Sequence, residues 1–188
     1  MNLNHNPFAS DRIGALRFRF PEGDDWERLL TRLQPTSWRG AVIGPHGSGK
    51  TTLLTEIEPR LIERGFYPRR VTFSAQGNTA ERQESISSIA SLRAPDFLLL
   101  DGAEQLTTRQ WLSIQSGAVA CAGCLITQHR QGRLPTIMEC GVTPELLNEL
   151  VHELCGAWLP EGEAPRLLAR HQGNIRKCLN ELYTRWDG

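Results

Sequence analysis

Short apolar runs alternate with amphipathic stretches along the first 140 residues of the chain. Each run is rich in aliphatic or β-branched residues and is bounded by turn-forming ones, which predicts strands. The stretches between them repeat apolar residues at helical spacing, which predicts helices. The predicted strands are residues 40–43, 70–74, 97–101, 123–127 and 136–139, and the predicted helices between them are residues 50–64, 80–92 and 107–117.

This alternation indicates an open α/β sheet whose strands are mainly parallel. An extended piece over Ala15–Phe20 and a helix over Asp24–Leu33 are expected ahead of the first sheet strand. Within the predicted helix 50–64, Pro59 is expected to cause a kink or an early end, and Gly65 is expected to cap the helix.

The pattern changes after about residue 143, where only helical periodicity remains. Thr143 followed by Pro144 is typical of a helix start, with threonine as the N-cap and proline in the first turn. The sequence therefore predicts an α/β core over residues 1–143, with the N-terminal strand and helix, and a helical domain over residues 144–188. That second domain is too short to build an independent core.

Residues 44–51 fit the pattern G-x-x-x-x-G-K-[ST], between a predicted strand and a predicted helix. Glycines in such a loop let backbone N–H groups turn toward an anion, and the following helix adds its positive N-terminus. Lys50 is expected to reach the β- and γ-phosphates of a nucleotide, and Thr51 to supply a hydroxyl ligand to Mg²⁺. The expected phosphate-binding residues are Gly44, Pro45, His46, Gly47, Ser48, Gly49, Lys50, Thr51 and Thr52.

A carboxylate closes the most apolar predicted strand, Phe97–Asp101. Asp101 is expected to hold Mg²⁺, directly or through water, as the acidic residue of a nucleoside triphosphate site does. Glu104 follows three residues later, whereas many such ATPases place a glutamate directly after the aspartate. Two interpretations of Glu104 stay open: a residue that orients the attacking water, and a solvated glutamate at a helix N-terminus.

Together, Gly44–Thr51, Asp101 and the late stretch Gly173–Arg176 resemble a compact AAA+ ATPase. The nearest likeness is to the small AAA+ proteins of type II secretion and of transposition target selection, in which an Asn-Pro-Phe segment precedes the core, here Asn6–Phe8. The resemblance implies a P-loop NTPase fold: a five-stranded, mainly parallel sheet flanked by helices, with a small C-terminal helical lid. ATP and Mg²⁺ are the cofactors that it implies.

The resemblance also suggests roles for three further positions. Arg176 matches the lid arginine that contacts the γ-phosphate and couples hydrolysis to lid motion. Thr127 or Gln128 would be the polar sensor at the end of the fourth strand, and Gln128 is the better hydrogen-bond donor. Arg130 and Arg133 lie where such proteins place an arginine finger that reaches a neighbouring subunit's nucleotide, although an exposed arginine-rich loop is the alternative.

The leading functional hypothesis is an ATPase that couples Mg-ATP binding and hydrolysis to lid motion and to the remodelling of a partner. A nucleotide-dependent switch with little hydrolysis is the main alternative, because no glutamate directly follows Asp101. A small P-loop kinase that uses Arg130 and Arg133 to bind a phosphorylated acceptor is a third. His46 and His129 receive no acid–base role, because phosphoryl transfer depends on positioning and electrostatics.

Composition and charge limit the partners. The 188 residues carry 21 basic and 21 acidic side chains, a net charge of zero, which argues against a broad electrostatic grip on nucleic acid without excluding a local patch. We expect an unidentified protein partner and a homo-oligomer as possible assemblies. No apolar run approaches the roughly 18 residues of a membrane span, and no secretory signal is visible, which predicts a cytoplasmic protein.

The cysteine pattern adds one question. Cys121 and Cys124 form a single C-x-x-C pair without a second pair, which is weak support for a zinc site. Because the pair opens an apolar strand, two small buried hydrophobic residues are the preferred interpretation.

Overall fold

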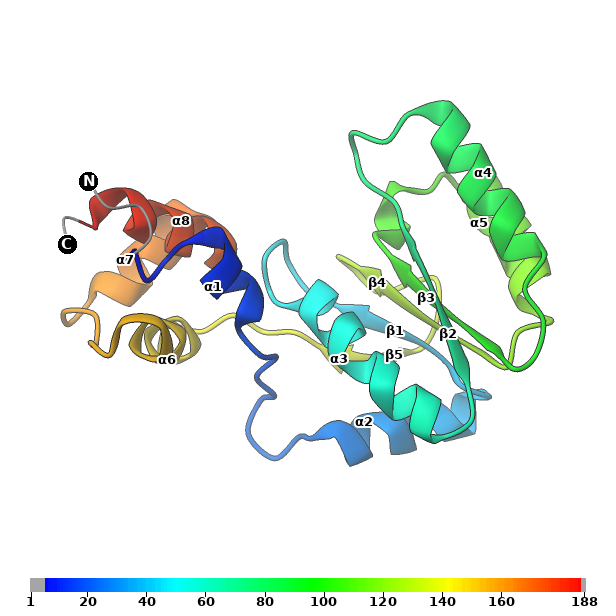
Figure 1. Ribbon diagram of the computed structural model, residues 1–188, viewed down its shortest axis with the longest axis horizontal. Coiled ribbons are helices and arrows are strands. Elements are labelled where there is room, and N and C mark those ends of the chain that lie inside the picture. The colour runs from blue at the N-terminus through cyan, green and yellow to red at the C-terminus, as the bar shows by residue number, and fades with distance from the viewer. Residues whose placement is uncertain (1–5, 187–188) are drawn as a thin grey trace. The chain divides into compact units, whose positions relative to one another are not determined.

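The computed structural model describes residues 6–186, and a parallel sheet of five strands organises the middle of the chain (Figure 1). The strand order is β2-β3-β4-β1-β5, and all neighbouring pairs are parallel. This arrangement confirms the predicted five-stranded α/β sheet. The strands are β1 (Arg39–Ile43), β2 (Tyr67–Thr72), β3 (Asp96–Asp101), β4 (Gly123–Gln128) and β5 (Thr136–Glu139).

Helices cover both faces of this sheet. Helices α4 (Thr79–Ala90) and α5 (Thr108–Ala118) lie on one face, and α2 (Trp26–Leu33) and α3 (Lys50–Glu63) on the other (Figure 1). Two short 3₁₀ turns, η2 (Gln34–Thr36) and η3 (Ala103–Gln105), follow α2 and β3.

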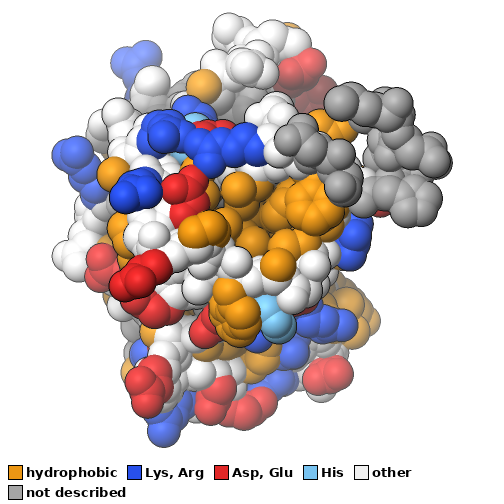
Figure 2. Space-filling model, turned by 90° about the vertical axis from the view of Figure 1, so that its left-hand side faces the viewer, with side chains coloured by type: hydrophobic (Ala, Val, Ile, Leu, Met, Phe, Trp, Pro, Cys, Tyr) orange, Lys and Arg blue, Asp and Glu red, His pale blue; other side chains and the backbone are white. Residues whose placement is uncertain are grey.

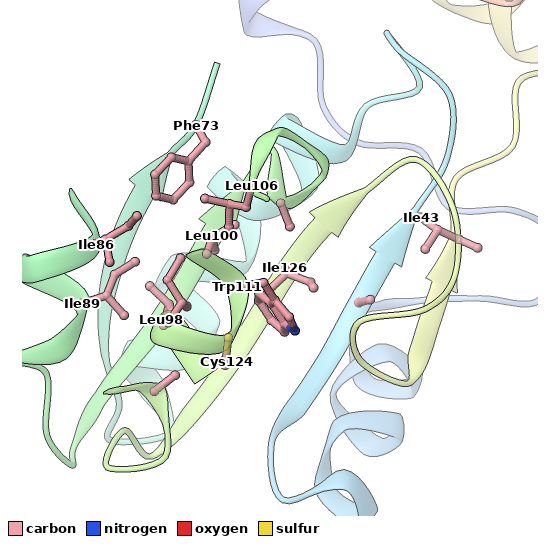
Figure 3. Packing of buried hydrophobic residues seen from close by; sticks show 14 residues of the cluster. Ile43, Phe73, Ile86, Ile89, Leu98, Leu100, Leu106, Trp111, Cys124 and Ile126 are labelled. Carbon is pink, nitrogen blue, oxygen red and sulfur yellow. The ribbon is translucent and has the colours of Figure 1, made fainter. Parts of the chain in front are cut away.

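Burial on both faces explains why the central strands are continuously apolar. Side chains alternate between the two faces of a strand, so Leu98 and Leu100 pack toward α4 and α5 with Ile89 and Trp111 (Figure 3). All four residues from Phe97 to Leu100 have no exposed surface. At roughly 25 cal/mol for each Å² of apolar surface removed from water, such strands are a main source of stability.

The predicted elements of this region are found, with small shifts at their ends. The second strand starts at Tyr67 rather than residue 70, and Gly65 follows α3 with a φ of 83°, as expected of a capping glycine. Pro59 lies inside α3, which continues to Glu63, so the proline does not end the helix. The N–H that proline lacks would have donated to the carbonyl of Thr55. Because Thr55 is exposed, water can donate to that carbonyl instead.

Contacts divide the chain into two compact units. The sheet unit comprises Glu22–Gly44 and Lys50–Glu139, and the helical unit comprises the chain up to Pro21, Pro45–Gly49 and everything from Cys140 onward. The helices of the second unit are α1 (Ser10–Ala15), α6 (Pro144–Cys155), α7 (Glu163–Arg170) and α8 (Ile175–Arg185).

The N-terminal segment belongs to the helical unit, which the predicted boundary at residue 143 does not anticipate. Phe8 is 3% exposed within the core of α6, α7 and α8, with its ring edge against Trp186. The Asn6 side chain donates to the carbonyl of Tyr183 at 2.9 Å, and Arg12 donates to that of Leu154 at 2.9 Å. The short C-terminal helices thus gain the apolar cover that they lack alone. The expected extended piece Ala15–Phe20 pairs with no strand, and α1 ends at its first residue.

The surface mixes both signs of charge. The face in Figure 2 shows acidic and basic side chains interspersed around a group of apolar ones. Among the described residues, no helix is long and apolar enough to cross a membrane.

Replacing Phe8 by alanine should destabilise the helical unit. Loss of a buried phenylalanine costs about 3–5 kcal/mol, which is a large share of the stability of so small a core. Hydrogen exchange of the α6 and α8 amides should accelerate, as measured by mass spectrometry. Glu161→Ala, at an exposed residue of the same unit, is the control and should change exchange little. Equal exchange in Phe8→Ala and wild type would contradict this role for the segment.

Candidate functional site

The glycine-rich loop lies where the sequence predicts it, between the end of β1 and the start of α3 at Lys50. Gly44, Gly47 and Gly49 all have positive φ, at 154°, 72° and 88°, which side chains would strain. The Lys50 ammonium donates to the carbonyl of Gly44 at 2.7 Å and is largely buried. The Ser48 hydroxyl closes the turn by donating to the carbonyl of Pro45 at 2.9 Å.

Within the helical unit, the tip of this loop contacts the start of α8. A Cβ atom added to Gly47 would overlap the side-chain oxygen of Asn174 and meet the backbone nitrogen of Arg176 at 3.3 Å. The same Asn174 oxygen caps α8 by accepting from the Lys177 N–H. The structure therefore brings the Gly173–Arg176 stretch to the loop residue Gly47, and the Arg176 side chain is exposed.

In the sheet unit, the Asp101 carboxylate joins three elements. Thr51 at the start of α3 donates to one of its oxygens at 2.8 Å, and Thr127 of β4 donates to the other at 2.5 Å. The Thr127 hydroxyl also accepts from the N–H of Gly102 at 2.9 Å. Thr127, the first of the two sensor candidates, is thus fully used in holding Asp101 and the chain after it.

The chain turns sharply after Asp101. Gly102 has a φ of 82°, and a Cβ atom there would overlap the carbonyl oxygen of Phe73, so only glycine fits. The turn η3 that follows places one Glu104 oxygen 3.1 Å from Nε2 of His129. The other Glu104 oxygen is buried and, among the described residues, accepts no hydrogen bond. The Glu104 side chain is therefore only partly exposed, at 23%.

Two more predicted residues lie near the end of β4. Gln128 is 3% exposed, and its side-chain nitrogen has no hydrogen-bond acceptor within the described chain. The exposed Arg130 follows, whereas the Arg133 guanidinium turns inward, donating to the carbonyl of Leu106 at 2.5 Å and lying 5.0 Å from the centre of the Trp111 ring.

Arg70 is the charged neighbour of this site that sequence reasoning missed. From β2 its guanidinium lies 3.7 Å from an Asp101 oxygen and donates to the carbonyl of Thr51 at 3.3 Å. It also donates to the Thr55 hydroxyl at 2.7 Å. No motif marks Arg70, because its proximity to Asp101 arises from strand pairing between β2 and β3.

Comparisons with known proteins bear on the fold. No protein-family model matches the chain, and no curated protein matches its sequence. Solved structures do resemble it: a point variant of RuvB from Thermotoga maritima, with a TM-score of 0.51 and 16% identity over 83% of this chain and 58% of RuvB. DnaA from Aquifex aeolicus bound to AMPPCP matches with a TM-score of 0.57 and 14% sequence identity, over 89% of this chain and 62% of DnaA. A replication initiator DnaA bound to AMPPCP and single-stranded DNA matches with a TM-score of 0.58 and 14% sequence identity, over 89% of this chain and 62% of that DnaA chain.

The fold is that of an AAA+ P-loop NTPase. The chain spans about three fifths of the length of these structures. At 14–16% identity the likeness extends to the fold alone. The expected nearer likeness to the ATPases of type II secretion and transposition target selection stays a prediction.

Within this AAA+ fold, Thr51 and Asp101 suit a magnesium ion. Both present oxygen atoms, the ligand type that Mg²⁺ prefers, and their oxygens already lie 2.8 Å apart. Asp101 is the only buried acidic residue in the described chain, which indicates a use for its charge.

The C-x-x-C pair shows no sign of a metal centre. Cys121 and Cys124 are 5% and 3% exposed, and within residues 6–186 no three histidine, cysteine or acidic side chains are grouped so that they could hold a metal ion. Burial raises the pKa of the Cys124 thiol to about 12 and that of Cys178 to about 11. Cys124 packs among apolar side chains of the sheet core, as the preferred interpretation holds (Figure 3).

Thiol labelling should separate these cysteines. At pH 8 a thiol with a pKa of about 12 is protonated in all but roughly one molecule in ten thousand, and thiolate is the reactive form. We expect native protein to react with a maleimide at the partly exposed Cys155 and not at Cys124 or Cys178. Peptide mass mapping before and after denaturation measures this, and rapid native labelling of Cys124 would contradict its burial.

Proposed function

We propose that this protein binds Mg-ATP and hydrolyses it as an AAA+-type ATPase. The observation that carries the proposal is the 2.8 Å hydrogen bond between Thr51 and Asp101. This bond joins the threonine that follows the loop lysine to a carboxylate fifty positions later. A hydroxyl and a carboxylate at these two places are the magnesium-binding groups of a P-loop site. The DnaA structures bound to AMPPCP share this fold and support a nucleoside triphosphate as the ligand.

The loop would bind the phosphates through its backbone. Three positive-φ glycines allow successive N–H groups to face an anion at the N-terminus of α3, and Lys50 adds a buried positive charge. Thr51 and Asp101 would hold Mg²⁺, which neutralises charge on the phosphate oxygens when bound. Arg176, whose backbone lies at Gly47, would contact the γ-phosphate as the sensor of the helical unit.

Glu104 would act on the attacking water. Its unpartnered buried oxygen and the unpartnered Gln128 nitrogen are costly unless each meets a polar group, so both favour a ligand or water as their partner. The water oxygen would form a bond to the γ-phosphorus as the bond to the bridging oxygen breaks. Its proton would pass to the Glu104 carboxylate, while Gln128 donates to a phosphate oxygen or to the water.

Assembly would complete the site. Of the two arginines that the sequence suggests as a finger for a neighbouring subunit's nucleotide in a homo-oligomer, Arg130 is the candidate, because its side chain is exposed whereas the Arg133 guanidinium turns inward. Hydrolysis would drive motion of the C-terminal helices α6, α7 and α8 as a lid and so remodel a protein partner. One of the similar DnaA structures is bound to single-stranded DNA, but the zero net charge of this chain favours a protein partner.

A nucleotide-dependent switch is the second candidate function. It is favoured by the position of Glu104, which follows Asp101 by three residues and whose one oxygen contacts His129. Such a site would hold Mg-ATP without activating water.

Replacing Lys50 by alanine should weaken ATP binding. Removal of a charge-assisted contact to phosphate costs about 1.5–3 kcal/mol, or roughly 10- to 100-fold in affinity. Isothermal titration calorimetry with Mg-ATP measures it. The control is Lys177→Ala, which removes the only other lysine, at an exposed position. Equal affinities for Lys50→Ala and wild type would refute the loop assignment.

Replacing Glu104 by glutamine should separate the ATPase from the switch. The amide keeps the shape but cannot accept a proton, so we expect unchanged binding and turnover lowered by about 10²- to 10⁴-fold. Phosphate release at several protein concentrations measures turnover, with the exposed Glu84→Gln as control. Turnover equal to wild type would remove Glu104 from the reaction. Tight binding without turnover in wild type at every concentration would support the switch.

A further inference from the structure

The Glu104 carboxylate is held at one end by a histidine. His129 directly follows β4, and its Nε2 lies 3.1 Å from Oε1 of Glu104. Both side chains are partly buried, His129 at 28% and Glu104 at 23% exposed, so this contact is more shielded from bulk solvent than a fully exposed pair is. The contact leaves only the other oxygen of Glu104 to act on a ligand or water.

The backbone of the same turn is held by two arginines. Arg82 of α4 donates to the carbonyl of Gln105 at 2.5 Å, and Arg133 donates to that of Leu106 at 2.5 Å. Together with the bond from Gly102 to Thr127, these contacts tie both sides of Glu104 to other elements of the sheet unit. A turn held at so many points has little freedom to change the direction of its side chain.

Arg133 is committed to its own chain. Its guanidinium lies over the Trp111 ring, and one of its terminal nitrogens donates to the carbonyl of Leu106. Burial lowers the pKa of Arg133, and the Glu104 carboxylate opposes that shift, so the two charges lie within electrostatic range. An arginine that reaches a neighbouring subunit would have to abandon all of these contacts.

We propose that His129 and Arg133 are positioning residues that hold Glu104 from within the same chain. The inference rests on the proposed hydrolysis, in which Glu104 receives a proton from water. The side chain of a glutamate three residues beyond its strand is oriented by the turn that carries it. The side chain of a glutamate directly after the strand is oriented by the strand itself. His129 fixes the carboxylate and Arg133 fixes the backbone two residues after it, at Leu106, so both act through Glu104 and not on the nucleotide.

A double-mutant cycle tests the role of His129. His129→Ala should lower kcat by about 10- to 100-fold with the Kd for Mg-ATP changed less than about 2-fold, because orientation and not binding is lost. His129→Gln, whose amide nitrogen can replace Nε2, should restore part of the rate. In a Glu104→Gln background, His129→Ala should cost nothing more. Losses that multiply would overturn the proposal. Gln131→Ala, exposed in the same loop, is the control.

Mixed oligomers test the role of Arg133. Arg133→Ala subunits retain a complete nucleotide loop, and Lys50→Ala subunits retain Arg133. If Arg133 acted on a neighbour, mixing the two inactive variants would restore turnover. We expect no recovery, and we expect Arg133→Ala to lose the same factor in dilute and concentrated protein. Recovery on mixing would overturn the proposal and establish Arg133 as a finger. Arg133→Lys, which keeps the charge, provides a variant less prone to unfold.

Hydrogen exchange gives a readout that needs no turnover. In nucleotide-free protein, His129→Ala and Arg133→Lys should each accelerate exchange of the amides in residues 102–106 at least about 5-fold, with strand β3 unchanged. Unchanged exchange would overturn the proposal even if wild type hydrolyses ATP. If wild type did not hydrolyse ATP but exchange were accelerated in the variants, only the proposed function would be contradicted.

Discussion

The buried carboxylate of Asp101 is the group on which the arrangement of the candidate site depends. A carboxylate removed from water is costly unless hydrogen bonds replace its hydration. Here the hydroxyls of Thr51 and Thr127 provide them, one from the helix after β1 and one from β4. Because β1, β3 and β4 are adjacent and parallel, their carboxyl ends meet at one edge, and satisfying Asp101 fixes the starts of three connecting segments at once.

Local chemistry explains why the phosphate loop and the strand that ends at Asp101 could be predicted from sequence. The strand Phe97–Leu100 is apolar at every position because both of its faces are covered, which few other structures require. The loop 44–51 carries its glycines where positive φ is needed, so its spacing is readable without any tertiary contact. The same reasoning places Asp101 at the site. Strand order cannot be obtained this way, because β1 lies between β4 and β5 through contacts remote in sequence.

Contacts remote in sequence also explain what could not be predicted. The Asn6 side chain binds the carbonyl of Tyr183, 177 positions away, so no local pattern assigns the N-terminal segment to the helical unit. Arg70 reaches Asp101 only because β2 pairs with β3 in a given register. The inward turn of Arg133 depends on the positions of Leu106 and Trp111, whereas its sequence context, a polar loop with several arginines, indicates an exposed residue.

In the proposed function, Glu104 is a site residue displaced along the sequence from its strand. Three residues separate it from Asp101, and a strand continuing straight would carry it away from the carboxyl edge. Gly102 prevents this, since its left-handed conformation turns the chain back against the carbonyl of Phe73, where a side chain would not fit. A turn is less rigid than a strand, because no ladder of hydrogen bonds holds it. The contacts from Thr127, His129 and Arg133 restrict the movement of this turn. The turn at Gly102 therefore lets a glutamate three residues beyond Asp101 contact the residue that follows β4.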